Sequence, residues 1–203
     1  MRTRRCLSAL LLVTVAGCAA APAGSTAPPT PQAEPPRVAT TTLPPSVAAP
    51  AASQVVPRRP ALAVLPDGTR MPVDVAGTTP AGALRVPDDV TRAGWWRGGS
   101  RLGDGFGSVV LAAHVDSRTQ GLGPAASLLG AAPGDVLLLV AGRHRQRFVV
   151  VSVTRVARDR LRERVDLFSA RGPLRLVFLT CGGPFDPLRG YRDNVVVVAR
   201  RTG

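Results

Sequence analysis

The sequence predicts a mainly β protein, a small closed barrel of eight strands with a few short helices. Short apolar runs recur between residues 56 and 203, and Gly, Pro or Asp residues separate them. Two tripeptides, Pro66-Asp67-Gly68 and Ala141-Gly142-Arg143, are typical of tight turns. Because the candidate helices are few and short, alternating βα units are disfavoured, and we expect the strands to close on themselves.

Each strand is expected where aliphatic and β-branched residues cluster without a helical period. In chain order these runs are 61–65, 71–75, 83–86, 108–114, 135–140, 147–156, 174–180 and 194–200. One helical turn is expected within 87–93, and short helices within 125–129 and 158–167. A domain at 56–203 is long enough to bury roughly two-thirds of its chain surface around one core.

The segment 18–55 has a different composition and is expected to be a disordered stalk. It is rich in Pro, Ala and Thr, and prolines are paired at 28–29, 35–36 and 44–45. Such a chain buries too little apolar surface to fold, and its prolines keep it extended. We therefore expect it to hold the folded domain away from whatever the N-terminus is attached to.

Residues 1–17 have the pattern of a signal peptide of the lipoprotein type. Arg2, Arg4 and Arg5 precede an apolar stretch at 7–15 that is too short to span a bilayer. The tetrapeptide 15–18, Val-Ala-Gly-Cys, resembles a bacterial lipobox, in which Cys18 would be lipid-modified. An ordinary secretory signal cleaved nearby is the alternative, and the match to a twin-arginine signal is partial. Either signal places the protein outside the cytoplasm, and lipidation would fix it to the extracytoplasmic face of the membrane.

The charge of the chain does not indicate nucleic-acid binding. The net charge is +13 and the chain contains no Lys, so all 26 basic residues are Arg. These arginines are scattered, and aromatic residues make up only 4% of the chain, so stacking platforms for bases are missing. Anionic wall polymers or lipid headgroups are better-matched neighbours for an exported protein. The acidic residues do not follow the spacing of a calcium loop, so we expect no metal and no cofactor.

One thiol, Cys181, stands alone in the predicted domain, because Cys6 and Cys18 belong to the signal region. A lone cysteine in an exported domain is either an inert core residue or a nucleophile. A nucleophile needs a proton carrier and a group that stabilises an oxyanion. His114 ends an apolar strand and could carry the proton, whereas His144 lies between two arginines at a predicted turn, where we expect it to be exposed without a role.

Three blocks together resemble the sortases, cysteine transpeptidases of the bacterial cell wall, and most closely the short actinobacterial sortases of class E and F type. The blocks are 110–116 (Val-Leu-Ala-Ala-His-Val-Asp), 176–186 (Leu-Val-Phe-Leu-Thr-Cys-Gly-Gly-Pro-Phe-Asp) and 191–199 (Tyr-Arg-Asp-Asn-Val-Val-Val-Val-Ala). Their order and spacing agree with the family, and the likeness extends over nearly all of the chain from residue 61. The resemblance implies a sortase-like closed β-barrel.

The resemblance also implies roles for individual residues. Cys181 would attack a peptide carbonyl and form a thioester, and His114 would act as the acid and base. Arg192 would donate hydrogen bonds to the substrate or to the developing oxyanion, for which a permanently charged fork of donors is suited. Thr180, Gly182 and Asp116 are further candidates for contacts with substrate.

The partners that the resemblance implies are secreted proteins with a C-terminal LPxTG-like or LAxTG-like sorting signal. An amine acceptor, peptidoglycan or its precursor, would receive the acyl part. The chain departs from many relatives at Ala113, where they carry Gly, and at 121–128, where they carry an aromatic residue. Because of these departures, the peptide sequence that the protein prefers is left open.

Three other interpretations are considered at this point. An L,D-transpeptidase is also a wall-active cysteine enzyme, but its Ser-x-Gly-Cys motif is absent, and a papain-like peptidase has the opposite order of Cys and His. The third possibility is a sortase-like domain that binds envelope components without catalysis. The intact His114, Cys181 and Arg192 argue against this module, although retained residues do not prove turnover.

Overall fold

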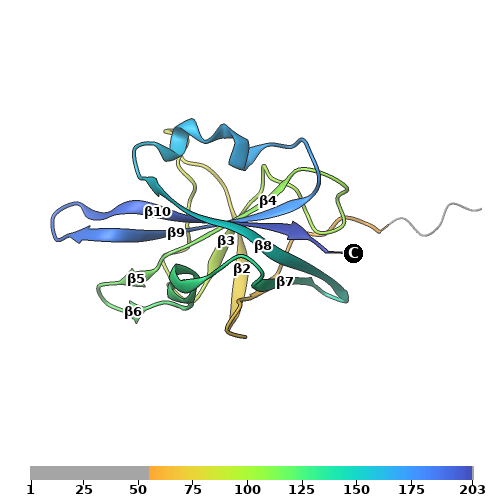
Figure 1. The fold of residues 1–203 in the computed structure, drawn as a ribbon, viewed down its shortest axis with the longest axis horizontal. Coiled ribbons are helices and arrows are strands. Elements are labelled where there is room, and N and C mark those ends of the chain that lie inside the picture. The colour runs from red at the N-terminus through yellow and green to blue at the C-terminus, as the bar shows by residue number, and fades with distance from the viewer. Residues whose placement is uncertain (1–54, 203) are drawn as a thin grey trace, which may run out of the picture. The chain divides into compact units, whose positions relative to one another are not determined.

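The fold is known for residues 55–202, which a computed structural model of the chain describes (Figure 1). The predicted signal peptide at 1–17 and nearly all of the predicted stalk at 18–55 therefore lie outside the described residues. Within residues 55–202 no helix is long and apolar enough to cross a membrane.

Eight strands close into a barrel, as the sequence predicts. Around the barrel the order is β1, β2, β3, β4, β9, β10, β8, β7. Two neighbouring pairs, β2–β3 and β4–β9, are parallel, and the other pairs are antiparallel. The strands are β1 (Leu62–Val64), β2 (Arg70–Ala76), β3 (Ala93–Trp96), β4 (Ser108–Ala113), β7 (Val136–Ala141), β8 (His144–Ala157), β9 (Arg175–Asp186) and β10 (Gly190–Arg201).

The connections carry the remaining elements. A small hairpin, β5 (Asp116–Ser117) and β6 (Gly121–Leu122), follows β4, and the 3₁₀ helix η1 (Pro124–Gly130) confirms the short helix expected at 125–129. The segment expected to be helical at 158–167 forms two 3₁₀ turns, η2 (Leu161–Glu163) and η3 (Val165–Phe168). The single helical turn expected within 87–93 is wrong, because residues 88–91 form bends and turns and Ala93 already begins β3.

One of the eight predicted strands is also wrong, although the number of strands is right. The run at 83–86 is not a barrel strand, and only Leu84 forms an isolated bridge, to Thr78. Leu84 and Val86 instead pack, partly buried, on an apolar cluster outside the barrel. The place in the barrel belongs to β3, whose Gly94 allows a close approach, since a Cβ there would lie 2.8 Å from Ala76 Cβ.

Three strands, β4, β9 and β10, are apolar on both faces. Their inward side chains, such as Leu111, Phe178 and Val197, belong to the main core, which fills the barrel. Their outward side chains form a second cluster, which the η2–η3 segment covers. This second cluster contains Val110, Ala112, Val156, Leu167, Val177, Leu179 and Val196. Apolar contacts therefore continue outside the barrel, on the side where the predicted site residues are found.

Leu176→Ala should destabilise the domain, because Leu176 is fully buried in the main core. The loss of methyl groups and the remaining cavity should lower the free energy of unfolding by about 2–5 kcal/mol, measured by urea denaturation. Leu188→Ala is the matched control, since Leu188 is 96% exposed and its loss should leave the free energy of unfolding nearly unchanged. Equal effects of the two substitutions would contradict the packing described here.

Candidate active site

A groove of about 1070 Å³ lies outside the barrel, next to the second apolar cluster. Ala112 on β4 and Leu179 on β9 contribute to its floor. One wall comes from residues of the β2–β3 connection between 78 and 88, and the other from Leu161, Arg162 and Phe168 of the η2–η3 segment. The groove is therefore built by segments that are far apart in the sequence.

The parallel pairing of β4 and β9 brings His114 and Cys181 together in this groove. Ala113 is the register partner of Thr180, so the next residues along the two strands are His114 and Cys181. Neighbouring strands are about 4.8 Å apart, and register partners project to the same face. Both side chains are half-buried and both line the groove, as their predicted roles require.

Asn194 lies opposite Cys181 on the other neighbouring strand. The antiparallel register of β9 and β10 pairs these two residues, and Asn194 lines the groove as well. Val196, two residues later, belongs to the outer cluster, which agrees with Asn194 projecting to the same outer face. The sequence analysis did not identify Asn194 as a site residue. Its one signal was alternation along the strand, because Val195, Val197 and Ala199 face the core and Asn194 therefore faces outward.

Burial dominates the electrostatics of the thiol. It raises the pKa of Cys181 because the negative thiolate loses solvation, the charge of Arg158 opposes this rise, and the carboxylate of Asp116 adds to it. Burial therefore disfavours the thiolate in the free protein. A reaction that needs the thiolate must supply positive charge near the sulfur or a base that takes its proton.

Two neighbouring arginines, Arg158 and Arg192, are candidates for the cation of the site, but of the two only Arg158 lines the groove. Arg158 follows the last residue of β8 and lines the groove. Arg192, predicted from the sequence as the catalytic cation, is exposed and is not among the residues that line it. The backbone N–H of Arg158 donates to the carbonyl oxygen of Arg192 at 2.9 Å, so the residue that follows β8 lies next to Arg192 on β10.

The three further candidates from the sequence lie in different surroundings. Thr180 lines the groove, and its Oγ1 is buried without a hydrogen-bond partner among residues 55–202. Gly182 is buried beneath the end of the barrel, where a Cβ would lie 2.8 Å from Val195 Cγ2. Asp116 accepts a hydrogen bond of 2.7 Å from the hydroxyl of Tyr191, which raises the pKa of that phenol.

The other histidine and the acidic residues add no second site of this kind. His144 is half-buried, not fully exposed as expected, and its Nε2 is buried without a partner among the described residues. Its position at the start of β8, after the turn at Gly142, is far along the strand from the groove-lining end. No group of three or more His, Cys, Asp or Glu residues suited to a metal ion occurs within residues 55–202.

Comparisons with known proteins agree with this geometry at the level of the fold. No protein-family model matches the chain, and a comparison with curated proteins finds no match. Among solved structures, sortase C1 of Group B Streptococcus pilus island 1 matches with a TM-score of 0.53 and 21% identity, over 70% of this chain and 64% of that chain. The chain thus spans just under two-thirds of that protein.

Two more solved structures give the same result. Sortase C of Streptococcus pneumoniae has a TM-score of 0.53 and 18% identity, over 74% of this chain and 72% of that chain. Sortase C2 of Group B Streptococcus pilus island 1 has a TM-score of 0.53 and 18% identity, over 74% and 77%. At such identities the likeness concerns the fold, and this chain has the sortase fold.

Proposed function

We propose that the protein is a sortase-type cysteine transpeptidase of the cell envelope. The observation that carries the proposal is the placement of His114 and Cys181 in one groove of a sortase fold, where His114 directly follows β4, Cys181 lies on β9, and the two strands pair in parallel up to Ala113 and Thr180. A nucleophile on one rigid strand and a proton carrier at the end of its neighbour are held in a fixed mutual position, which covalent catalysis requires.

The first half of the reaction would form a thioester. The Cys181 thiolate attacks the scissile carbonyl carbon, and the carbonyl oxygen becomes an oxyanion. The C–N bond then breaks, and protonated His114 donates its proton to the leaving amine. The groove lies beside β4 and β9, so a peptide bound along it would present its carbonyl to Cys181.

The second half would transfer the acyl group to an amine. The incoming amine attacks the thioester carbon, its proton passes to His114, and the C–S bond breaks to restore the thiolate. We propose peptidoglycan or its precursor as the acceptor, in keeping with the implied family. The chain contains no Lys, so it has no side-chain amine that could accept its own acyl group.

The apolar lining of the groove supports a sorting signal of the LPxTG or LAxTG kind. Leu84 and Val86 lie on one wall, and Trp96 contacts Phe168 edge-to-face, with ring centroids 5.6 Å apart. Aliphatic and proline side chains of a peptide would bury their surface here. We extend the proposal to secreted substrates that carry such a signal, processed outside the cytoplasm by an enzyme held to the membrane through a lipid on Cys18.

A non-catalytic binding module is the second candidate, and the position of Arg192 favours it. This predicted catalytic cation is exposed and does not line the groove, and burial disfavours the thiolate of Cys181. A groove with an idle thiol could still bind an envelope peptide. Turnover of a peptide is the measurement that separates this module from an enzyme.

Cys181→Ala should abolish cleavage of a quenched LPxTG or LAxTG peptide and the transfer of its acyl part to an added amine. His114→Gln should lower the rate of peptide cleavage by about 10²- to 10⁴-fold, because water would have to carry out the proton transfers in place of His114. Mass spectrometry of the wild-type protein should reveal an acyl adduct on the peptide that contains Cys181. Cleavage that persists in Cys181→Ala, with circular dichroism unchanged from wild type, would refute the mechanism.

Asp116→Asn should move the titration of Cys181 to lower pH, because the Asp116 carboxylate disfavours the thiolate. Iodoacetamide labelling of Cys181 at neutral pH, resolved by peptide mass, should therefore become faster. The chain has a single tyrosine, so the pH-dependent change of near-ultraviolet absorbance that accompanies tyrosinate formation reports Tyr191, and its ionisation should also shift to lower pH.

Asp67→Asn is the matched control for this charge change. Asp67 lies in the exposed β1–β2 turn, where its carboxylate accepts hydrogen bonds from Thr69. This control should leave the labelling of Cys181 and the absorbance of Tyr191 unchanged. If Asp116→Asn changed neither titration, or moved that of Cys181 upward, the described charge environment would be incorrect.

Cys18→Ala should release the protein from the membrane fraction, because an acyl chain on Cys18 is the proposed anchor. The measurement is the distribution of the full chain between membrane and soluble fractions of a host that processes lipoproteins. Cys6→Ala is the control and should leave the protein with the membrane. Retention of Cys18→Ala in the membrane fraction would show that another segment is the anchor.

A further inference from the structure

We propose that Arg158, which directly follows β8, is the positioning cation of this site and favours the negatively charged form of the Cys181 sulfur that the reaction uses. The inference rests on the proposed function for its chemical purpose, since a thiolate is what thioester formation consumes. It concerns a residue outside the three sequence blocks on which the catalytic prediction was based. The evidence is the strand register, two hydrogen bonds and the lining of the groove.

The strand register places Arg158 on the face of the barrel that carries Cys181. Cys181 pairs with Asn194 on β10, and Asn194 pairs with Val156 on β8. Val156 belongs to the outer cluster, and Arg158, two residues later, continues on the same face. The side chain of Arg158 reaches toward Arg189 in the β9–β10 connection, and Arg158 lines the same groove as Cys181.

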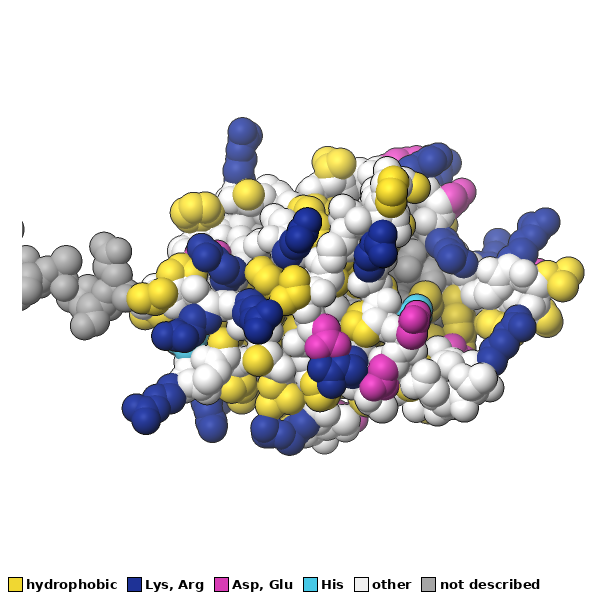
Figure 2. Space-filling model, turned by 180° about the vertical axis from the view of Figure 1, so that it is seen from behind, with side chains coloured by type: hydrophobic (Ala, Val, Ile, Leu, Met, Phe, Trp, Pro, Cys, Tyr) yellow, Lys and Arg dark blue, Asp and Glu magenta, His cyan; other side chains and the backbone are white. Residues whose placement is uncertain are grey.

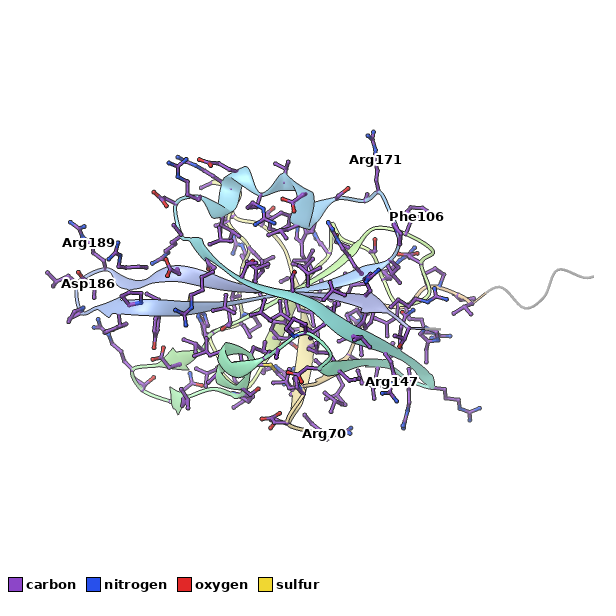
Figure 3. The ribbon with its side chains drawn as sticks, in the orientation of Figure 1. Arg70, Phe106, Arg147, Arg171, Asp186 and Arg189 are labelled. Atoms are coloured by element: carbon purple, nitrogen blue, oxygen red, sulfur yellow. The ribbon has the colours of Figure 1, made fainter. Side chains whose placement is uncertain are left out.

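Two hydrogen bonds hold Arg158 in this place. Its backbone N–H donates to the carbonyl oxygen of Arg192, and its Nη1 donates to the carbonyl oxygen of Arg189 at 3.2 Å. Arg189 lies at the tip of the β9–β10 hairpin, where Figure 3 labels it. None of the ion pairs within residues 55–202 involves Arg158, so its charge is not cancelled by a carboxylate.

The hairpin that receives Arg158 is also fixed from its other side. Arg118 Nη2, on the β5–β6 connection, donates to the carbonyl oxygen of Pro187 at 3.1 Å, and Tyr191 donates to Asp116. Figure 1 shows β9 and β10 extending together beyond the barrel, with the η2–η3 segment and the β5–β6 hairpin flanking them. The guanidinium of Arg158 is thus attached to a braced element and not to a free loop.

The charges around the thiol explain why a cation is needed here. Desolvation raises the pKa of Cys181, Asp116 on β5 raises it further, and Arg158 is the cation that lowers it. The other titratable or charged groups that face the groove or contact Asp116 are His114, Tyr191, Arg162, Arg85 and Asp88. Arg192 is exposed and does not line the groove, but it is the neighbouring cation predicted from the sequence. The experiment must therefore distinguish the effect of Arg158 on Cys181 from that of Arg192.

The test measures the pH dependence of Cys181 labelling by iodoacetamide in the full chain, with each cysteine resolved by peptide mass. Arg158→Gln should move the midpoint upward by about half to one pH unit, which is roughly a three- to tenfold loss of labelling rate at neutral pH. Arg158→Lys keeps the charge and should restore most of the labelling. A merely structural role for Arg158 would not be rescued by lysine in this way.

Two variants serve as comparisons. Arg160→Gln removes a charge from the same segment, but Arg160 pairs with Glu163 and does not line the groove, so the midpoint should stay in place. Arg192→Gln should also leave the midpoint within about 0.2 pH units, whatever its effect on peptide turnover. Added salt should raise the midpoint of the wild type and not that of Arg158→Gln, since salt screens a charge that the variant lacks.

An unchanged midpoint in Arg158→Gln, or an upward shift produced by Arg192→Gln in its place, would overturn the inference. No substrate is present in these measurements, so they do not depend on peptide turnover. A protein that fails to cleave peptides but shows the Arg158 shift would refute the proposed function and retain the inference.

Discussion

The parallel pairing of β4 with β9 is the constraint on which the rest of the site depends. One register, Ala113 with Thr180, places His114 beside Cys181 and directs both to the outer face. A slip of one residue would turn either side chain into the barrel core, because successive residues alternate between faces. The inward neighbours on β4 and β9, including Leu111 and Phe178, are fully buried, so the packing of the core holds the register that the chemistry requires.

The second apolar cluster gives this constraint its functional consequence. An ordinary barrel strand alternates apolar and polar side chains, whereas β4 is buried on both faces. The outer face needs a cover, and the η2–η3 segment and the β2–β3 connection supply it. Where this cover opens, the strands still carry apolar side chains, and a groove remains with Cys181 at its end. Arginines are spread over the surface visible in Figure 2, so the charge of the whole protein does not mark the site.

Much of the barrel and the two residues at its centre could be predicted from sequence, because long apolar runs report burial directly. The strand β3 could not, since Ala93–Trp96 is short and contains a glycine, while the 83–86 run is apolar for packing outside the barrel. Asn194 and Arg158 were also missed. Their importance comes from pairing across β8, β9 and β10, which joins Asn194 to Cys181 and to Val156, residues on separate strands that no local pattern connects.

The position of the Cys181 thiol must satisfy two opposed requirements, a fixed geometry and an accessible thiolate form. A half-buried sulfur is partly shielded from solvent and is positioned by β9, but this burial disfavours the thiolate that attacks a carbonyl. A cation at the edge of the groove can offset this cost without filling the space that a peptide must occupy. A guanidinium hydrogen-bonded to the backbone carbonyl of Arg189 meets that condition, because its charge is fixed in position at a residue that lines the groove, and one hydrogen bond leaves most of its N–H donors available. The braced β9–β10 hairpin is thus part of the electrostatics of Cys181 as well as of the fold.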